Sequence, residues 1–176
     1  MKILLLTDIH GNLPALEAAL RHPAAQGADR VVSTGDHTGF GPCPRQVTER
    51  LMALNADILA GNHEERLPQA DDPVFAGYNW ELLRWTRAQM EGLPLTWPRT
   101  LQTGEMLFAH GTPENPNELL EAEEVPALLA RLPEGVRWYF SGHNHNTWNV
   151  CAHGCRAVNP GSLGLMEDGV GGRAPF

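Results

Sequence analysis

The sequence predicts an α/β fold with mixed β-sheets covered by helices. Short apolar runs alternate with helical patterns in the first half of the chain and pair into hairpins in the second half. Alternating strands and helices indicate a parallel sheet, whereas hairpins indicate antiparallel strands. In addition, five of the apolar runs end on residues that can bind a metal ion. We therefore expect the ends of neighbouring strands to converge on one site.

In the first half, three strands are each followed by a helical pattern. The expected strands are residues 2–7, 31–34 and 57–60. Asn12 can cap the first helix and Pro14 suits its first turn, and the helix is expected to end before Gly27. The next helix is expected over residues 47–54, where Val47, Leu51 and Leu54 lie on one face, and a short helix is expected to begin over 62–66.

The second half is expected to combine two hairpins with two helices. The expected elements are a helix over 78–90, a hairpin over 101–109, a helix over 119–132 that Pro126 splits or restarts, a strand over 138–141, and a hairpin of 148–152 with 156–158. No internal repeat and no linker rich in glycine and serine interrupts the sequence. A chain of 176 residues suits one domain, which we expect over residues 1–176.

Charge and composition exclude several classes of protein. The net charge of −8, without a Lys/Arg cluster, argues against binding a long nucleic acid. No apolar stretch is long enough to span a bilayer, and no signal-peptide pattern precedes the first strand, so we expect a cytoplasmic protein without a membrane partner. The three cysteines, Cys43, Cys151 and Cys155, are expected to be reduced thiols rather than a disulfide framework or a zinc site.

The residues that follow the apolar runs have the chemistry of a two-metal site. They are Asp8, His10, Asp36, Asn62, His110, His143 and His145. Carboxylates, imidazoles and an amide oxygen are suitable ligands for divalent transition metals. A hydrolytic site with two metals usually places one carboxylate between ions about 3.5–4 Å apart, and Asp36 is the candidate. His63, beside Asn62, is then left for another role.

Each of these residues alone has an ordinary explanation. Asp8 could cap the helix that follows it, and Asp36 and Asn62 could be turn residues. A single buried histidine such as His110 is more often a structural residue than a ligand. These explanations fail together, because they do not account for the position of every one of these residues at the end of an apolar run.

The same residues resemble the motifs of a known superfamily. Asp8-x-His10, Gly35-Asp36, Gly61-Asn62-His63-Glu64, His110-Gly111 and Gly142-His143-x-His145 occur in the order found in calcineurin-like metallophosphoesterases. The turn Asn159-Pro160-Gly161-Ser162 is also similar to one in small bacterial phosphodiesterase-type members. The resemblance implies a sandwich of two mixed β-sheets with helices on the outer faces.

The resemblance also implies the role of each residue. Asp8, His10 and His145 would bind one divalent metal ion, Asn62, His110 and His143 the other, and Asp36 would bridge them. The expected catalytic residues are His63, which would contact the phosphate and protonate the leaving oxygen, and Asp8, which would also orient that imidazole. A hydroxide bridging the metals would attack phosphorus. Mn²⁺ is the favoured metal, and Fe, Zn²⁺, Co²⁺ and Ni²⁺ stay open.

The loop after Asp36 favours a small phosphodiester as substrate. Phe40 stands where related monoesterases and diadenosine tetraphosphatases carry an arginine that grips phosphate. A dianionic monoester would benefit most from such a cation, although Arg45 or Arg66 could still reach the pocket. A phosphomonoesterase or nucleotidase therefore stays open as the alternative. Residues 68–100 and 112–130 are expected to form the rim.

Three further expectations concern function, assembly and neighbouring residues. A non-catalytic scaffold of the same fold, as in a retromer subunit, would be expected to lack His63, so this alternative ranks last.

The chain is shorter at its C-terminus than similar proteins, and residues 171–176 could be the stub of a strand whose open sheet edge favours a homodimer. Glu64 is interpreted as a carboxylate at a helix start, and a pocket role for His37 stays open.

Overall fold

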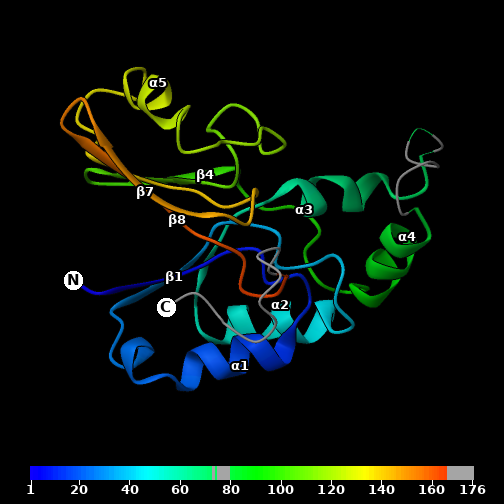
Figure 1. Ribbon diagram of the computed structural model, residues 1–176. Coiled ribbons are helices and arrows are strands. Elements are labelled where there is room, and N and C mark those ends of the chain that lie inside the picture. Colours follow the sequence, from blue (N-terminus) through cyan, green and yellow to red (C-terminus); the bar gives the residue numbers. More distant parts are fainter. Residues whose placement is uncertain (73, 75–79, 166–176) are drawn as a thin grey trace.

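The protein is layered, and the layers follow the order of the chain. The structure is a computed structural model that describes residues 1–72, 74 and 80–165 (Figure 1). Two helices cover one face of a three-stranded sheet, whose other face packs on a five-stranded sheet. A short helix covers the far face of the second sheet. This is the sandwich with outer helices that the sequence predicted.

The first sheet is built from strands that are joined by helices. Its strands are β1 (Ile3–Leu6), β2 (Arg30–Ser33) and β3 (Asp57–Ile58), in the order β1-β2-β3. They are connected by α1 (Leu13–Arg21), η1 (Pro23–Ala25) and α2 (Pro44–Ala53). The Asn12 side chain caps α1 by accepting a hydrogen bond from the Ala15 amide at 3.1 Å, as predicted. In the described part of the chain this sheet is purely parallel rather than mixed, because each connection is a helical crossover.

The second sheet is mixed and contains both predicted hairpins. Its strands are β4 (Thr100–Thr103), β5 (Met106–Ala109), β6 (Trp138–Phe140), β7 (Thr147–Ala152) and β8 (Cys155–Pro160). The order is β4-β5-β6-β8-β7, so two antiparallel hairpins flank a strand that pairs in parallel with both. His153 and Gly154 turn the second hairpin with φ of 53° and 72°, the left-handed conformation that two-residue hairpin turns favour.

The remaining helices are short and lie beside or beyond the sheets. They are α3 (Asn62–Arg66), η2 (Leu67–Gln69), α4 (Trp80–Gln89) and α5 (Val125–Leu129). Of the helix expected over residues 119–132, only α5 is helical. It begins at Val125 and has Pro126 in its first turn, where no backbone amide hydrogen is needed. The first residues of the helix expected over 78–90, and the expected strand stub at 171–176, lie outside the described residues.

Alternation along the strands separates the core into layers. Leu4 and Leu6 of β1 pack towards α1 and α2, whereas Ile3 and Leu5 point to the second sheet. Phe108 is fully buried between the two sheets. A third cluster, on the other face of the second sheet, packs against α5. No helix in the described ranges is long and apolar enough to cross a membrane.

Phe108→Ala should destabilise the protein strongly, because the ring is fully buried and stacks on Phe140 at a centroid distance of 4.7 Å. We expect a loss of about 3–5 kcal/mol in the free energy of unfolding, measured by urea denaturation. Met52→Ala, at a 44% exposed position of α2, is the control and should change stability by about 0.5 kcal/mol or less. Equal effects of the two substitutions would contradict the assigned core.

Candidate metal centre

The structure brings all seven predicted ligands together at one edge of the two sheets. They follow strands β1, β2, β3, β5 and β6, whose ends meet at this edge. Asp8, Asp36 and His110 are 0–2% exposed, so the centre of the cluster is closed to bulk water. His143 and His145 lie partly open to solvent. The seven residues therefore form one largely buried cluster at the strand ends.

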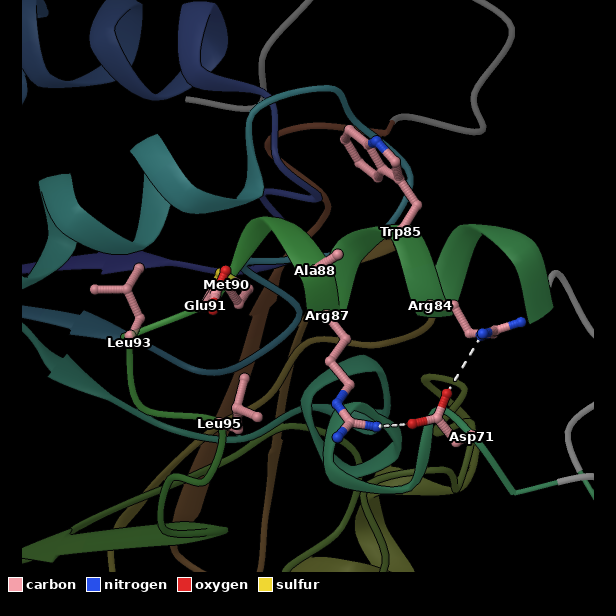
Figure 2. A pocket seen from close by; sticks show the side chains of 10 residues that line it. Asp71, Arg84, Trp85, Arg87, Ala88, Met90, Glu91, Leu93 and Leu95 are labelled. Carbon is pink, nitrogen blue, oxygen red and sulfur yellow. Dashed lines mark hydrogen bonds and ion pairs between the residues drawn. The ribbon is translucent and has the colours of Figure 1, made fainter.

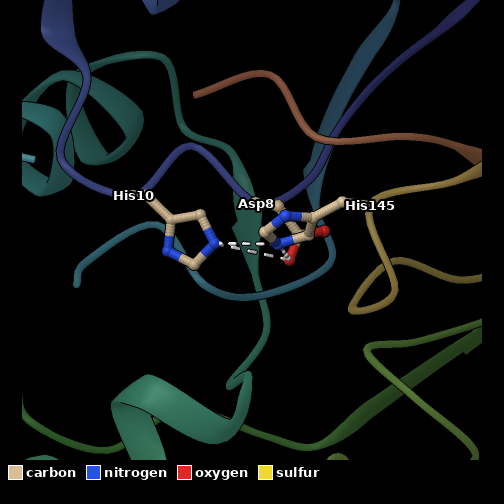
Figure 3. Close-up of side chains that lie close together, drawn as sticks. All are labelled: Asp8, His10 and His145. Carbon is tan, nitrogen blue, oxygen red and sulfur yellow. Dashed lines mark hydrogen bonds and ion pairs between the residues drawn. The ribbon is translucent and has the colours of Figure 1, made fainter. Parts of the chain in front are cut away.

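Asp8, His10 and His145 form the first half of the cluster. His145 Nε2 lies 3.2 Å and His10 Nε2 lies 3.8 Å from Asp8 Oδ1. The two Nε2 atoms are 3.0 Å apart. Figure 3 shows both imidazole rings pointing towards the Asp8 carboxylate, although the residues come from opposite ends of the chain.

Asp36, Asn62, His110 and His143 form the second half. His110 Nε2 lies 3.3 Å from Asp36 Oδ2 and 3.1 Å from Asn62 Oδ1. The same amide oxygen is 2.9 Å from His143 Nδ1. Asp36 Oδ2 is also 4.0 Å from His10 Nε2 of the first half. Asp36 thus lies between the two halves, where a bridging carboxylate would be.

The orientation of the side chains fits bound cations. His10 Nδ1 lies 3.2 Å from the Thr38 carbonyl oxygen and His110 Nδ1 lies 3.1 Å from the Thr34 carbonyl oxygen. If both nitrogens donate to these carbonyls, each Nε2 directs a lone pair into the cluster. Asp8 Oδ1 has no hydrogen-bond partner among the described residues. Such converging acceptors repel one another unless positive charge lies among them, so these His/Asp clusters suit a dinuclear metal site.

The pKa values of His110 and Asp36 show that positive charge is favourable in this cluster. Burial opposes protonation of His110, but Asp36 and Asp8 outweigh it and raise the pKa of His110 to about 9. Burial likewise opposes ionisation of Asp36, yet His110 and His63 hold the pKa of Asp36 well below its usual range. Two carboxylates in this dry cluster attract a proton onto an imidazole when no stronger cation is available.

The backbone at the site is strained in a consistent way. Five of the seven predicted ligands have left-handed backbone conformations: Asp8 (φ 52°), His10 (48°), Asp36 (49°), His143 (74°) and His145 (57°). Residues other than glycine rarely adopt this region, and such strain gathers at functional sites. Gly35 also allows close approach of the loops, because a Cβ atom there would lie 2.6 Å from Gly61 N.

His63, the expected proton donor, lies at the edge of the cluster. Its Nε2 is 3.8 Å from Asp36 Oδ2, and its backbone amide donates to Asp36 Oδ1 at 2.9 Å. The ring contacts those of Phe40 and His10, with centroids 4.8 and 5.0 Å apart. Its side chain is 13% exposed, so it can meet a molecule that enters from solvent. By distance it could also join His10 and Asp36 around a metal.

Glu64 does more than the helix-start role that the sequence indicated. Its Oε2 accepts hydrogen bonds from the amides of Gly61 (2.9 Å) and Asp36 (2.8 Å). Its Oε1 accepts from the Thr38 amide and hydroxyl at 2.9 and 2.7 Å. The Gly61 contact is the expected cap of α3. The others tie the loop that carries Asp36 to the loop that carries Asn62, a role that no local sequence pattern reveals.

Burial opposes ionisation of Glu64, but His37 and the hydrogen bonds from Thr38 hold its pKa below the usual range. The fully buried His37 lies behind this carboxylate, with its Nδ1 3.5 Å from Glu64 Oε1. His37 thus lies beside Glu64, and its ring packs edge-on against Trp97 with centroids 4.6 Å apart.

Other supporting contacts come from residues outside the predicted ligand set. The Ser162 hydroxyl donates to the Asp8 carbonyl at 2.8 Å, and Asn159 Nδ2 donates to the Gly142 carbonyl at 2.8 Å. The Thr7 hydroxyl donates to the Asp8 carboxylate. The turn at residues 159–162 therefore holds the histidine loop and Asp8 in place. The motif was visible in the sequence, but its contacts were not.

The two arginines that could reach the site behave differently. Arg45 donates to the carbonyls of Gln89 (3.2 Å) and Glu91 (2.8 Å), next to α4. Arg66 donates from Nη2 to Asn117 Oδ1 at 2.7 Å, and its Nη1 lies 3.2 Å from the Asn62 amide group. Arg66 therefore reaches the cluster.

A separate groove of about 640 Å³ runs along α4 (Figure 2). Arg84 and Arg87 point from α4 to the same carboxylate, that of Asp71, at 3.3 and 2.5 Å. None of the seven predicted ligands lines this groove. The candidate chemistry therefore belongs to the strand-end cluster.

Glu64→Gln should weaken metal binding, because its NH₂ group would face backbone amides that now donate to an oxygen. We expect an affinity for Mn²⁺ about 10–100-fold lower than that of the unchanged protein, measured by isothermal titration calorimetry. Glu65→Gln is the matched control, since Glu65 is the next residue of the same helix and pairs with Arg99 instead. Equal affinities for the two variants would show that Glu64 does not position the ligands.

Comparison with known proteins agrees with the geometry. The chain is 35% identical over 182 residues to phosphodiesterase YfcE of Escherichia coli, covering 96% of this chain and 83% of that protein. It is 26% identical over 196 residues to an uncharacterized protein of Methanocaldococcus jannaschii, covering 96% and 78%. A crystal structure of a metallophosphoesterase from Sphaerobacter thermophilus superposes with a TM-score of 0.77 at 26% identity, covering 96% of this chain and 80% of that one.

The sequence model of one family spans nearly the whole chain. The calcineurin-like phosphoesterase superfamily domain matches residues 1–174. This range contains every strand, every loop that carries a predicted ligand, and the turn at 159–162. The chain therefore belongs to the calcineurin-like phosphoesterase superfamily.

Proposed function

We propose that the protein is a two-metal phosphodiesterase that hydrolyses a small phosphodiester. The observation that carries the proposal is the convergence of seven side chains able to bind metal from five strand ends, with their acceptor atoms facing one another. The 35% identity to a protein named as a phosphodiesterase supports the same reaction.

Each half of the cluster has the ligands for one cation. Asp8, His10 and His145 would hold the first ion, and Asn62, His110 and His143 the second, with Asp36 between them. Mixed nitrogen and oxygen ligands suit Mn²⁺, our favoured metal, and also Fe, Zn²⁺, Co²⁺ or Ni²⁺. When bound, two such cations would lower the pKa of a water and neutralise charge on the phosphate.

His63 is the proposed proton donor to the leaving oxygen. Its ring lies at the rim of the buried cluster, within 3.8 Å of Asp36 Oδ2, and remains partly open to solvent. The Asp36 carboxylate and the amide hydrogen bond to Asp36 hold the residue beside the place where phosphate would bind. A group in this position can protonate an alkoxide as the ester bond breaks.

Phe40 favours a diester over a monoester. Its ring is 40% exposed and packs against His63 and His10, so it forms an apolar wall beside the proposed proton donor. Such a wall suits the organic part of a leaving group and provides no positive charge for the second negative charge of a phosphomonoester. A phosphomonoesterase is the second candidate, because Arg66 Nη1 lies 3.2 Å from the Asn62 amide group and so brings one cation to the cluster.

Metal removal should abolish the activity, and the type of ester should decide between the two candidates. With added Mn²⁺ we expect hydrolysis of bis(4-nitrophenyl) phosphate, with a higher kcat/KM than for 4-nitrophenyl phosphate. Treatment with EDTA should remove the activity, and excess Mn²⁺ should restore it. Activity that resists EDTA would contradict the two-metal proposal, whereas a preference for the monoester would favour the second candidate.

His63→Ala should lower kcat by about 10²–10⁴-fold, the usual contribution of a general acid, while metal affinity changes little. The loss should shrink for a diester whose leaving group is a weak base, because such a group needs less protonation. His22→Ala is the control, since His22 is a partly exposed histidine outside the ligand cluster that accepts a hydrogen bond from the Ala24 amide. If His63→Ala instead loses metal, His63 is a ligand rather than a proton donor.

A further inference from the structure

Asn144 lies between two of the predicted ligands, but the hydrogen bonds of its side chain go to other residues. It separates His143 from His145 in the chain and is 7% exposed. Its Nδ2 atom donates to the Leu120 carbonyl at 2.6 Å, and its Oδ1 atom accepts from the Asn146 amide at 3.2 Å. Because a backbone carbonyl only accepts and a backbone amide only donates, these two partners fix which end of the side chain is the oxygen.

The side chain of Asn159 is fixed in the same way and is joined to that of Asn144. Asn159 is fully buried, its Nδ2 atom donates to the Gly142 carbonyl at 2.8 Å, and its Oδ1 atom accepts from the Gly161 amide at 2.9 Å. The same Nδ2 atom donates to Asn144 Oδ1 at 2.8 Å. The two amides therefore form one hydrogen-bonded pair whose polarity is set by the backbone at each end.

This pair of amides closes the histidine loop, residues 142–146, on both sides of its ligands. Asn159 holds the carbonyl of the residue immediately before His143, and Asn144 holds the amide of the residue immediately after His145. Both histidines have left-handed backbones, with φ of 74° and 57°. Residues other than glycine keep this conformation only where their surroundings impose it, so the loop depends on such contacts.

The two histidines of this loop reach different halves of the ligand cluster. The His143 ring lies beside that of His110, with centroids 5.0 Å apart. His145 Nε2 lies 3.0 Å from His10 Nε2. The loop therefore carries one predicted ligand for each metal ion, and the backbone at Asn144 sets the relative position of the two.

We propose that Asn144 is a positioning residue that sets His143 and His145 relative to each other, and thereby the spacing of the two metal ions. This inference rests on the proposed function, since it takes both histidines as metal ligands. Contacts that orient metal ligands typically change the affinity for the metal about 10–100-fold. Because one loop serves both ions, loss of the Asn144 side chain should weaken the binding of both.

The surroundings of Asn144 allow this role to be separated from a role in folding. The Leu120 carbonyl also accepts from Trp148 Nε1 at 3.1 Å, and Asn159 Nδ2 has a backbone carbonyl as its other acceptor. Both groups therefore keep a partner when the Asn144 side chain is removed. Asn146 is exposed, so water can replace the acceptor that its amide loses. Asn144→Ala should thus fold, with the histidine loop held less firmly.

The test compares Asn144→Ala with Asn149→Ala, which makes the same change at an exposed position of β7. The stoichiometry and dissociation constants of Mn²⁺ are measured by isothermal titration calorimetry, and thermal unfolding is measured without added metal. The electron paramagnetic resonance spectrum of each Mn²⁺-saturated protein reports the magnetic coupling between the two ions, which depends on their spacing. Asn144→Ser, whose shorter side chain cannot replace all of the lost hydrogen bonds, is used if Asn144→Ala does not fold.

We expect Asn144→Ala to bind two Mn²⁺ ions, with each affinity lowered about 10–100-fold and with an altered magnetic coupling. Asn144→Asp keeps an oxygen that can accept from the Asn146 amide and from Asn159, although it no longer donates to Leu120. It should therefore bind Mn²⁺ more tightly than Asn144→Ala. Asn149→Ala should match the unchanged protein in every measurement.

Unchanged Mn²⁺ affinities and coupling in Asn144→Ala, with only a lower unfolding temperature, would show a purely structural role and overturn the inference. Weaker binding of one Mn²⁺ ion alone would also overturn it, because Asn144 would then serve only one half of the cluster. Failure of the proposed function is distinct, because the unchanged protein itself would then bind fewer than two Mn²⁺ ions or fail to hydrolyse bis(4-nitrophenyl) phosphate.

Discussion

The main constraint on the site is the repulsion among ligand atoms that are all hydrogen-bond acceptors. Asp8 Oδ1, Asp36 Oδ2 and several imidazole nitrogens converge within 3.0–4.0 Å of one another in a buried cluster. In a medium of low polarity this concentration of negative charge is costly unless a cation compensates it. The pKa of His110 is raised to about 9 for a related reason, because the Asp36 and Asp8 carboxylates lie beside its ring and outweigh its burial. Much of the surrounding structure serves to hold this unfavourable arrangement in place.

Hydrogen bonds between neighbouring loops support the residues of the cluster. Glu64 joins the loops of Asp36 and Asn62, and Ser162 joins the last turn to Asp8. The strained left-handed backbone at five ligands can persist because these hydrogen bonds and the packed sheets overdetermine it. A carboxylate such as Glu64 is effective in this role because its two oxygens can accept from several backbone amides at once.

The sequence predicted the parts of the structure that have local or repeated signals. The strands, both hairpins, the cap at Asn12 and the ligand positions follow from apolar runs and the residues after them. The contacts of Glu64 and Arg66 could not be predicted, because they join loops far apart in the chain. The single domain, the homodimer and the cytoplasmic location stay predictions.

Fold and chemistry are carried by different residues in this protein, which is why the site rather than the fold must support the functional proposal. The three apolar clusters hold the helices and sheets together, and none of the seven predicted ligands belongs to them, although Ile9 and Ala109 are direct neighbours of predicted ligands in the chain. His63 takes part in none of them, and its main contacts are with Asp36, His10 and Phe40. A chain with the same core could therefore lose His63 and remain folded as a binding scaffold. The presence of His63 beside the seven predicted ligands favours an enzyme.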